Sequence, residues 1–125
     1  MAGEERDIKV HIDNVKKTYM GRTGEVVALN GVNLDIANNE FVTVVGPSGC
    51  GKSTLLNIIA GLLEPSSGTV TCNGKVVTGT GPDRGVVFQQ YALFQWLTVK
   101  KNVMFGLNMK GINGEEAEEI AMKYI

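Results

Sequence analysis

The sequence predicts an α/β fold in which an antiparallel sheet near the N-terminus leads into a buried strand, a glycine-rich loop and a helix. Apolar and polar residues alternate over 8–12 and again over 32–36, as in strands with one buried face. Residues 41–45 are nearly all apolar and mostly β-branched, which is typical of a strand covered on both faces. Apolar residues then recur at helical spacing over 55–63 and give that segment one apolar face.

The first 45 residues are expected to form an antiparallel sheet that feeds this buried strand. The strand at 8–12 is followed by a turn-rich connection over 19–24, and 26–29 begins a second strand. Asn38 and Asn39 mark the turn into the buried strand, because asparagine adopts turn conformations readily.

Beyond the glycine-rich loop, Pro and Gly in 65–68 are expected to stop the helix. Residues 69–78 predict a hairpin about Asn73 and Gly74, because this dipeptide is a strong hairpin signal. After a loop, the apolar run 86–88 predicts one more short strand.

Two helices are predicted near the end of the sequence. Thr98 is expected to cap the first, and Asn113 with Glu116 three residues later resembles a capping box that opens the second. Their apolar residues are Val99, Val103 and Leu107 in the first helix, and Ala117, Ile120, Ala121 and Tyr124 in the second. No Gly, Pro or capping residue ends the second helix, so we expect the sequence to stop within it.

The composition excludes several classes of protein. With 125 residues, 43% of them hydrophobic and 20% charged, the chain is expected to form one globular domain. Its longest apolar stretch, residues 58–63, is far shorter than the about 20 residues of a membrane-spanning helix. The net charge of −1 lacks the basic excess of proteins that bind nucleic acid, so we expect no such partner. Cys50 and Cys72 form neither a disulfide framework nor a metal-ligand spacing, which indicates a reducing compartment.

Residues 46–53, Gly-Pro-Ser-Gly-Cys-Gly-Lys-Ser, match the P-loop or Walker A pattern. Triphosphate oxygens need several backbone N–H groups that point inward, in conformations that glycine adopts readily. The loop must also lead into a helix N-terminus, whose partial positive charge favours anions. Lys52 would reach the β- and γ-phosphates, and Ser53 would offer its hydroxyl to Mg²⁺.

Residues 46–62 closely resemble the ATP-binding subunits of ABC transporters, especially those of importers. The likeness continues in the same order through Pro-Ser-Ser-Gly, Asn-Gly and Val-Phe-Gln-Gln, which occupy 65–68, 73–74 and 87–90. Gly-Pro-Asp-Arg-Gly at 81–85, followed by Trp-Leu-Thr-Val at 96–99, is most similar to the nitrate, sulfonate and taurine import branch. The resemblance covers nearly the whole chain from Ile8 onward.

This resemblance implies an α/β P-loop NTPase core of the RecA-like type with an N-terminal antiparallel β subdomain, truncated before the helical subdomain is complete. Residues 1–125 would then be the N-terminal part of a single ABC ATP-binding domain whose C-terminal half is absent. The implied cofactors are ATP and Mg²⁺. The residues expected to bind the nucleotide are Tyr19, Gly46, Pro47, Ser48, Gly49, Cys50, Gly51, Lys52, Ser53 and Thr54. Ser53 and Gln89 are expected to bind the metal, and Gln89 is the candidate catalytic residue.

Three of the implied roles have structural alternatives. Tyr19 stands where the family places an aromatic ring that stacks on adenine, but it is also explained as a half-buried tyrosine of the small sheet. Gln89 matches the Q-loop glutamine, which contacts Mg²⁺ or the attacking water, but it is also explained as a polar strand end. Tyr91, Phe94 and Trp96 lie where the family docks a membrane-domain helix, and a buried aromatic cluster explains them equally well.

Hydrolysis also needs a carboxylate at the end of an apolar strand, and no carboxylate after Lys52 follows such a run. His11 precedes the P-loop and cannot be the family's late switch histidine, and the signature Leu-Ser-Gly-Gly-Gln is absent. We therefore expect a fragment that binds nucleotide weakly and hydrolyses little. Whether the chain itself is an enzyme stays open at this point.

The expected function is an ATP-binding subunit of an import system for a small anion such as nitrate, sulfonate or taurine. Its expected partners are membrane-spanning permease subunits, a second ATP-binding subunit and, indirectly, a periplasmic or lipoprotein substrate-binding protein. It is expected at the cytoplasmic face of the cell membrane.

Two alternatives remain. One is another P-loop enzyme, although a small-molecule kinase needs an arginine-rich lid and Arg84 is the only arginine after Lys52. A GTPase needs Asn-Lys-x-Asp for guanine, and no such tetrapeptide occurs. The other alternative is a non-catalytic truncated product, which folds poorly or regulates intact subunits.

Overall fold

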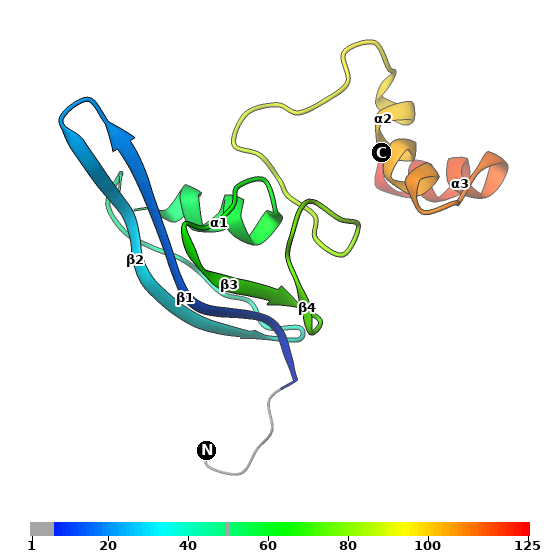
Figure 1. The fold of residues 1–125 in the computed structure, drawn as a ribbon. Helices are drawn as coiled ribbons and strands as arrows, with labels where there is room; N and C mark the ends of the chain where they lie inside the picture. The colour runs from blue at the N-terminus through cyan, green and yellow to red at the C-terminus, as the bar shows by residue number, and fades with distance from the viewer. Residues whose placement is uncertain (1–6, 50) are drawn as a thin grey trace. The chain divides into compact units, whose positions relative to one another are not determined.

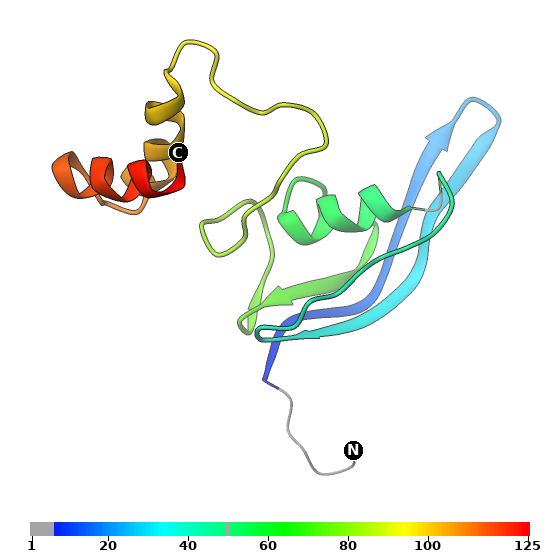
Figure 2. The same cartoon turned by 180° about the vertical axis from the view of Figure 1, so that it is seen from behind.

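The structure is a computed structural model that describes residues 7–49 and 51–125. The chain divides into two compact units, Met1–Gly85 and Val86–Ile125, which are described separately (Figures 1 and 2). The first unit contains the sheet and one helix, and the second contains two helices.

The first unit is built on a four-stranded antiparallel sheet with the order β2-β1-β3-β4. The bounds of these strands are Ile8–Gly21 for β1, Gly24–Ala37 for β2, Ser67–Cys72 for β3 and Lys75–Val76 for β4. Strand β1 pairs with β2 on one side and with β3 on the other. Figures 1 and 2 show the helix of this unit, α1 (Lys52–Ala60), against one face of the sheet.

The core lies between this face and α1. Its buried side chains are Val10, Ile12 and Val15 from β1, Leu29 from β2, Leu55 and Ile58 from α1, and Val70 and Cys72 from β3. Strict alternation along β1 would turn residue 14 inward, but the pairing register shifts between Ile12 and Val15, and Asn14 has a φ of 47°. This irregularity brings Val15 back to the core face, as an inserted residue in a strand does.

The hairpin about Asn73 and Gly74 is confirmed, since both residues have positive φ angles, 52° and 79°, and join β3 to β4. The helix after the glycine-rich loop is also confirmed, but it ends at Ala60 rather than at 65–68. Gly61, with a φ of 83°, ends it, and the Leu62 N–H donates to the Asn57 carbonyl. A glycine in this left-handed conformation commonly ends a helix.

The prediction of a buried strand at 41–45 is wrong. Among the described residues this segment belongs to no strand, and Phe41 and Val45 are 93% and 83% exposed. A strand exists only where a neighbouring strand completes its hydrogen-bond ladder, and the ladders of the described sheet do not include this segment. The short strand predicted at 86–88 is absent for the same reason, and Val87 is fully exposed.

The second unit is a helical hairpin of α2 (Val99–Met109) and α3 (Gly114–Tyr124). Thr98 caps α2 as predicted, because its Oγ1 accepts a hydrogen bond from the Lys101 N–H at 3.1 Å. Asn113 is the N-cap of α3, but its side chain donates to the Gly111 carbonyl instead of forming a capping box. Ala117 and Ala121 of α3 are fully buried.

The turn before α2 is held by Asn102, whose amide nitrogen donates to the carbonyls of Phe94, Leu97 and Thr98. The Phe94 ring lies 5.2 Å from that of Trp96 and 4.7 Å from that of Phe105, centroid to centroid. Phe94 therefore belongs to an aromatic cluster within the second unit, whereas the Tyr91 side chain is fully exposed.

The chain's only histidine lies on the exposed face of the sheet, as its place in the alternating pattern predicts. His11 lies directly opposite Asp35 in the β1–β2 register, and its Nδ1 contacts the Asp35 carboxylate. This hydrogen bond raises the pKa of His11, and the charges of Asp35 and Asp13 act in the same direction, against partial desolvation. The charged imidazolium is thus favoured in the folded state.

We expect the free energy of unfolding to fall as the pH rises above about 6.5 and through the raised pKa of His11. The stabilisation is complete below the unfolded pKa, where both states are protonated, and is lost once the folded imidazole deprotonates. Urea unfolding between about pH 5.5 and pH 8.5 measures this slope. His11→Gln and Asp35→Asn should both flatten it, and an unchanged slope in His11→Gln would assign it to another group.

Candidate functional site

The glycine-rich loop leads directly into the N-terminal end of α1. Gly49 and Gly51 have φ angles of 81° and 95°, a region that other residues enter only with strain. Gly51 is the N-cap of α1 and offers no side chain to its N–H groups, and the first turn contains no acidic residue. The N–H groups of the first turn point toward this end of the helix, and together with the helix dipole they favour an anion there.

Close packing on β2 holds the end of the loop in place. A Cβ atom at Gly51 would lie 2.6 Å from the Ala28 carbonyl oxygen and 2.9 Å from the Leu29 Cδ2 atom. Only glycine fits this contact without movement of the β2 backbone. The start of α1 is therefore fixed against the sheet.

The Lys52 ammonium lies at the loop. Its Nζ donates hydrogen bonds to the carbonyl oxygens of Gly46 and Pro47, at 2.6 and 2.7 Å. Phosphate oxygens are stronger acceptors for an ammonium group than neutral carbonyls, so an anion at the loop would compete for these hydrogen bonds.

The other loop residues predicted to bind the nucleotide are within reach of solvent. Gly46, Pro47, Ser48, Gly49 and Ser53 are exposed, and Gly51 and Thr54 are half-buried. Cys50, which the sequence also places in this set, lies outside the described residues. The described residues of the loop predicted to bind the nucleotide therefore lie together at the N-terminal end of α1.

Tyr19 lies in the outer part of β1, opposite Val26, and is 42% exposed. The Lys17 Nζ lies 5.4 Å from the centroid of its ring and donates to the Glu64 carbonyl at 2.8 Å. Lys17 is opposite Leu29, which packs against Gly51, so β2 brings the ring and the loop to the same end of the unit. Figure 1 shows the start of α1 beside this arm of the sheet.

Gln89 lies in the second unit, so it is described apart from the loop. It is exposed and belongs to a segment without helix or strand. Among residues 7–49 and 51–125, no cluster of three or more His, Cys, Asp or Glu side chains could hold a metal ion. The roles predicted for Gln89 and Ser53 toward Mg²⁺ stay predictions.

The sequence patterns assign no structural role to two basic residues, Lys17 and Arg84. Lys17 shares a face of β1 with Tyr19, and its spacing of two residues could have revealed this neighbour. Arg84 donates to the carbonyls of Ile59 and Gly79, and no local pattern predicts the contact with Ile59, which lies 25 positions away.

In the part of the chain that the structure describes, no helix is both long and apolar enough to cross a bilayer.

Comparisons with known proteins agree with the resemblance noted in the sequence. The ABC transporter family model matches residues 29–124. The nitrate import ATP-binding protein NrtD of Synechocystis sp. is 48% identical over 116 residues, which cover 93% of this chain and 44% of NrtD. The taurine import ATP-binding protein TauB of Pelagibacter ubique is 53% identical over 103 residues, which cover 82% of this chain and 38% of TauB.

A solved dimeric ATP-binding cassette with bound ADP and Pi matches with a TM-score of 0.80 and 38% identity, over 91% of this chain and 54% of that one. This match confirms the α/β fold class. The chain thus spans less than half the length of the curated relatives it matches and about half of the solved cassette.

Proposed function

Because the chain belongs to the ABC transporter family, we propose that residues 1–125 form the N-terminal part of a single ATP-binding domain of an import subunit. The observation that carries this proposal is the loop at the start of α1. There a glycine N-cap, the helix N-terminus and the Lys52 ammonium all favour a polyphosphate. The NTPases of the wider P-loop class bind triphosphates with the same combination of features.

In this proposal the predicted site residues contact three parts of the ligand: the phosphates, the base and the metal ion. The N–H groups of the loop and the Lys52 ammonium bind the phosphates, and the exposed Tyr19 ring stacks on the base. The Ser53 hydroxyl and the Gln89 amide oxygen are neutral oxygen ligands, which suit a Mg²⁺ ion that takes its charged ligands from the phosphates. Bound Mg²⁺ would neutralise charge that develops on the β- and γ-phosphates. Gln89 would position the attacking water in the complete protein.

In the complete protein, two such subunits would bind ATP between them and drive transport by membrane-spanning permease subunits. The names of NrtD and TauB support a small anion such as nitrate, a sulfonate or taurine as cargo. A substrate-binding protein would deliver this cargo outside the membrane. The subunit itself would lie at the cytoplasmic face.

Equilibrium binding of ATP to the 125-residue chain tests the proposal. We expect saturable binding that Mg²⁺ strengthens and that inorganic triphosphate competes for, because the loop contacts phosphates rather than the base. We expect hydrolysis to stay at background, since beyond Lys52 the sequence contains no carboxylate at the end of an apolar strand. Absence of saturable binding, or robust Mg²⁺-dependent hydrolysis by this chain, would contradict the proposal.

A further inference from the structure

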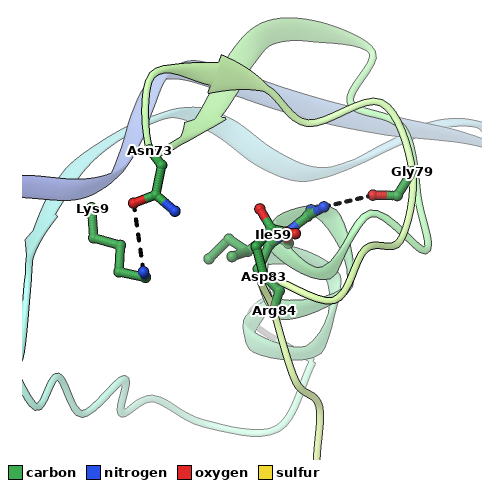
Figure 3. A network of polar contacts seen from close by, with 6 residues as sticks. All are labelled: Lys9, Ile59, Asn73, Gly79, Asp83 and Arg84. Atoms are coloured by element: carbon green, nitrogen blue, oxygen red, sulfur yellow. Dashed lines mark hydrogen bonds and ion pairs between the residues drawn. The ribbon is translucent and has the colours of Figure 1, made fainter. Parts of the chain in front are cut away.

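The Arg84 side chain joins two backbone segments of the first unit. Its Nη1 donates to the Ile59 carbonyl at 3.0 Å. Its Nη2 donates to the Gly79 carbonyl at 2.9 Å, as Figure 3 shows. The side chain is only 13% exposed, and its Nε lies 3.4 Å from an Asp83 carboxylate oxygen. A guanidinium can make both carbonyl contacts at once because its N–H donors form a rigid fork.

The Ile59 carbonyl belongs to the last turn of α1. Carbonyls there lack partners within the helix and form the negative end of its dipole, where a cation is stabilising. The last turn of α1 contains no basic residue of its own, so Arg84 supplies this cation from another segment. The contact is close, because a Cβ atom at Gly61 would overlap the Gly79 backbone.

Asp83 balances the charge of this contact. Burial opposes ionisation of its carboxyl, but the Asp83 backbone N–H, the Cys72 thiol and Arg84 together lower its pKa. The carboxylate therefore stays charged beside the guanidinium at neutral pH. Nearby, Lys9 of β1 donates to the side chain of Asn73, in the turn between β3 and β4, at 3.5 Å (Figure 3).

Arg84 lies directly before the segment that carries Gln89. Its backbone N–H donates to the Gly81 carbonyl, and the next residue, Gly85, is the last of the first unit. Gln89 follows five residues after Arg84. The segment that carries Gln89 thus starts at the C-terminal end of α1, and the N-terminal end of α1 carries the phosphate loop. A nine-residue helix of about 13 Å connects the two ends as a rigid rod.

We propose that Arg84 is a positioning residue that fixes the start of the Gln89 segment to α1 and thereby couples this segment to nucleotide binding at the loop. The coupling rests on the proposed function. Arg84 does not touch the nucleotide in this proposal, so its loss should leave nucleotide affinity nearly unchanged and should uncouple residues 85–90.

Backbone amide NMR of the 125-residue chain tests the proposal, because one titration reports both ends of α1. In the wild type, MgATP should shift the amide resonances of the loop, of α1 and of 85–90. In Arg84→Met, the loop resonances should give a Kd within about threefold of the wild type, while the shifts of 85–90 fall by at least about half. Lys75→Met removes an exposed cation of β4 and should behave as the wild type.

Arg84→Lys is the second variant, because it keeps the charge but cannot bridge both carbonyls with the same geometry. It should show the same uncoupling, and native β1 resonances confirm folding in each variant.

A response of residues 85–90 to MgATP in Arg84→Lys that is as large as in the wild type overturns the proposal. If the wild type binds no MgATP, the proposed function fails and the coupling with it. Heteronuclear NOE values without nucleotide still decide the anchoring, because they should fall at 80–90 in both variants.

Discussion

Replacing Lys52 by Ala is expected to weaken MgATP binding to this chain by about 10- to 100-fold. A hydrogen bond to a charged group contributes about 1.5–3 kcal/mol net, and each 1.4 kcal/mol corresponds to tenfold in affinity. The Lys52 ammonium already lies at the loop, 2.6 Å from the Gly46 carbonyl and 2.7 Å from the Pro47 carbonyl. The nucleotide therefore does not have to recruit the ammonium from solvent.

Isothermal titration calorimetry measures this loss, and two further variants make the result specific. Lys75→Ala removes a lysine from β4 and should bind MgATP as the wild type does. Lys52→Arg keeps the charge and should recover part of the affinity, because it still offers N–H donors to the phosphates. If Lys52→Ala binds MgATP within twofold of the wild type, the loop does not bind the phosphates as proposed.

Local signals in the sequence predicted the elements that neighbouring residues determine. The Asn73-Gly74 turn, the helix after the glycine-rich loop and the Thr98 cap all depend on residues a few positions apart. The length of the first strand was underestimated, because the irregularity at Asn14 breaks the alternation that marks a strand. A period-two pattern is readable only while the pairing register stays constant.

The prediction for 41–45 failed for a different reason. Its apolar, β-branched residues indicate an environment that suits the segment, but a strand forms only where neighbours supply the hydrogen-bond ladder. The ladders of the described sheet join only β1 to β4, and Phe41 stays 93% exposed. The composition of a segment therefore predicts that it can form a strand, but not whether another strand lies beside it to complete the hydrogen-bond ladder.

For the candidate site, too, the sequence predicted the features set by neighbouring residues but not the contacts between distant ones. The P-loop pattern is contiguous, so the sequence alone identified the loop and the helix that follows it. The contacts of Arg84 with Ile59 and of Lys17 with Glu64 join residues 25 and 47 positions apart. Such contacts depend on how the helix packs on the sheet, which no local pattern encodes. The resemblance to a family indicated the segment around Arg84, but it did not indicate what the side chain does.

Replacing Gly61 by Ala is expected to lower the free energy of unfolding by roughly 2–5 kcal/mol. Two effects add up at this position. Its φ of 83° is left-handed, which costs about 1–2 kcal/mol for a residue with a Cβ atom. The Cβ would also overlap the Gly79 backbone, and forcing extra atoms into a packed contact costs about 1–3 kcal/mol.

Gly74→Ala separates these two effects. Gly74 has nearly the same φ, 79°, but a Cβ atom there would meet nothing within 4 Å. Its substitution should therefore show only the conformational cost, about 1–2 kcal/mol, in the same urea unfolding experiment. Equal losses in both variants would mean that the Gly79 loop yields without cost. In that case the α1 end and the loop would not be packed tightly enough to hold the Arg84 contacts, so the comparison also bears on how firmly the Gln89 segment is anchored.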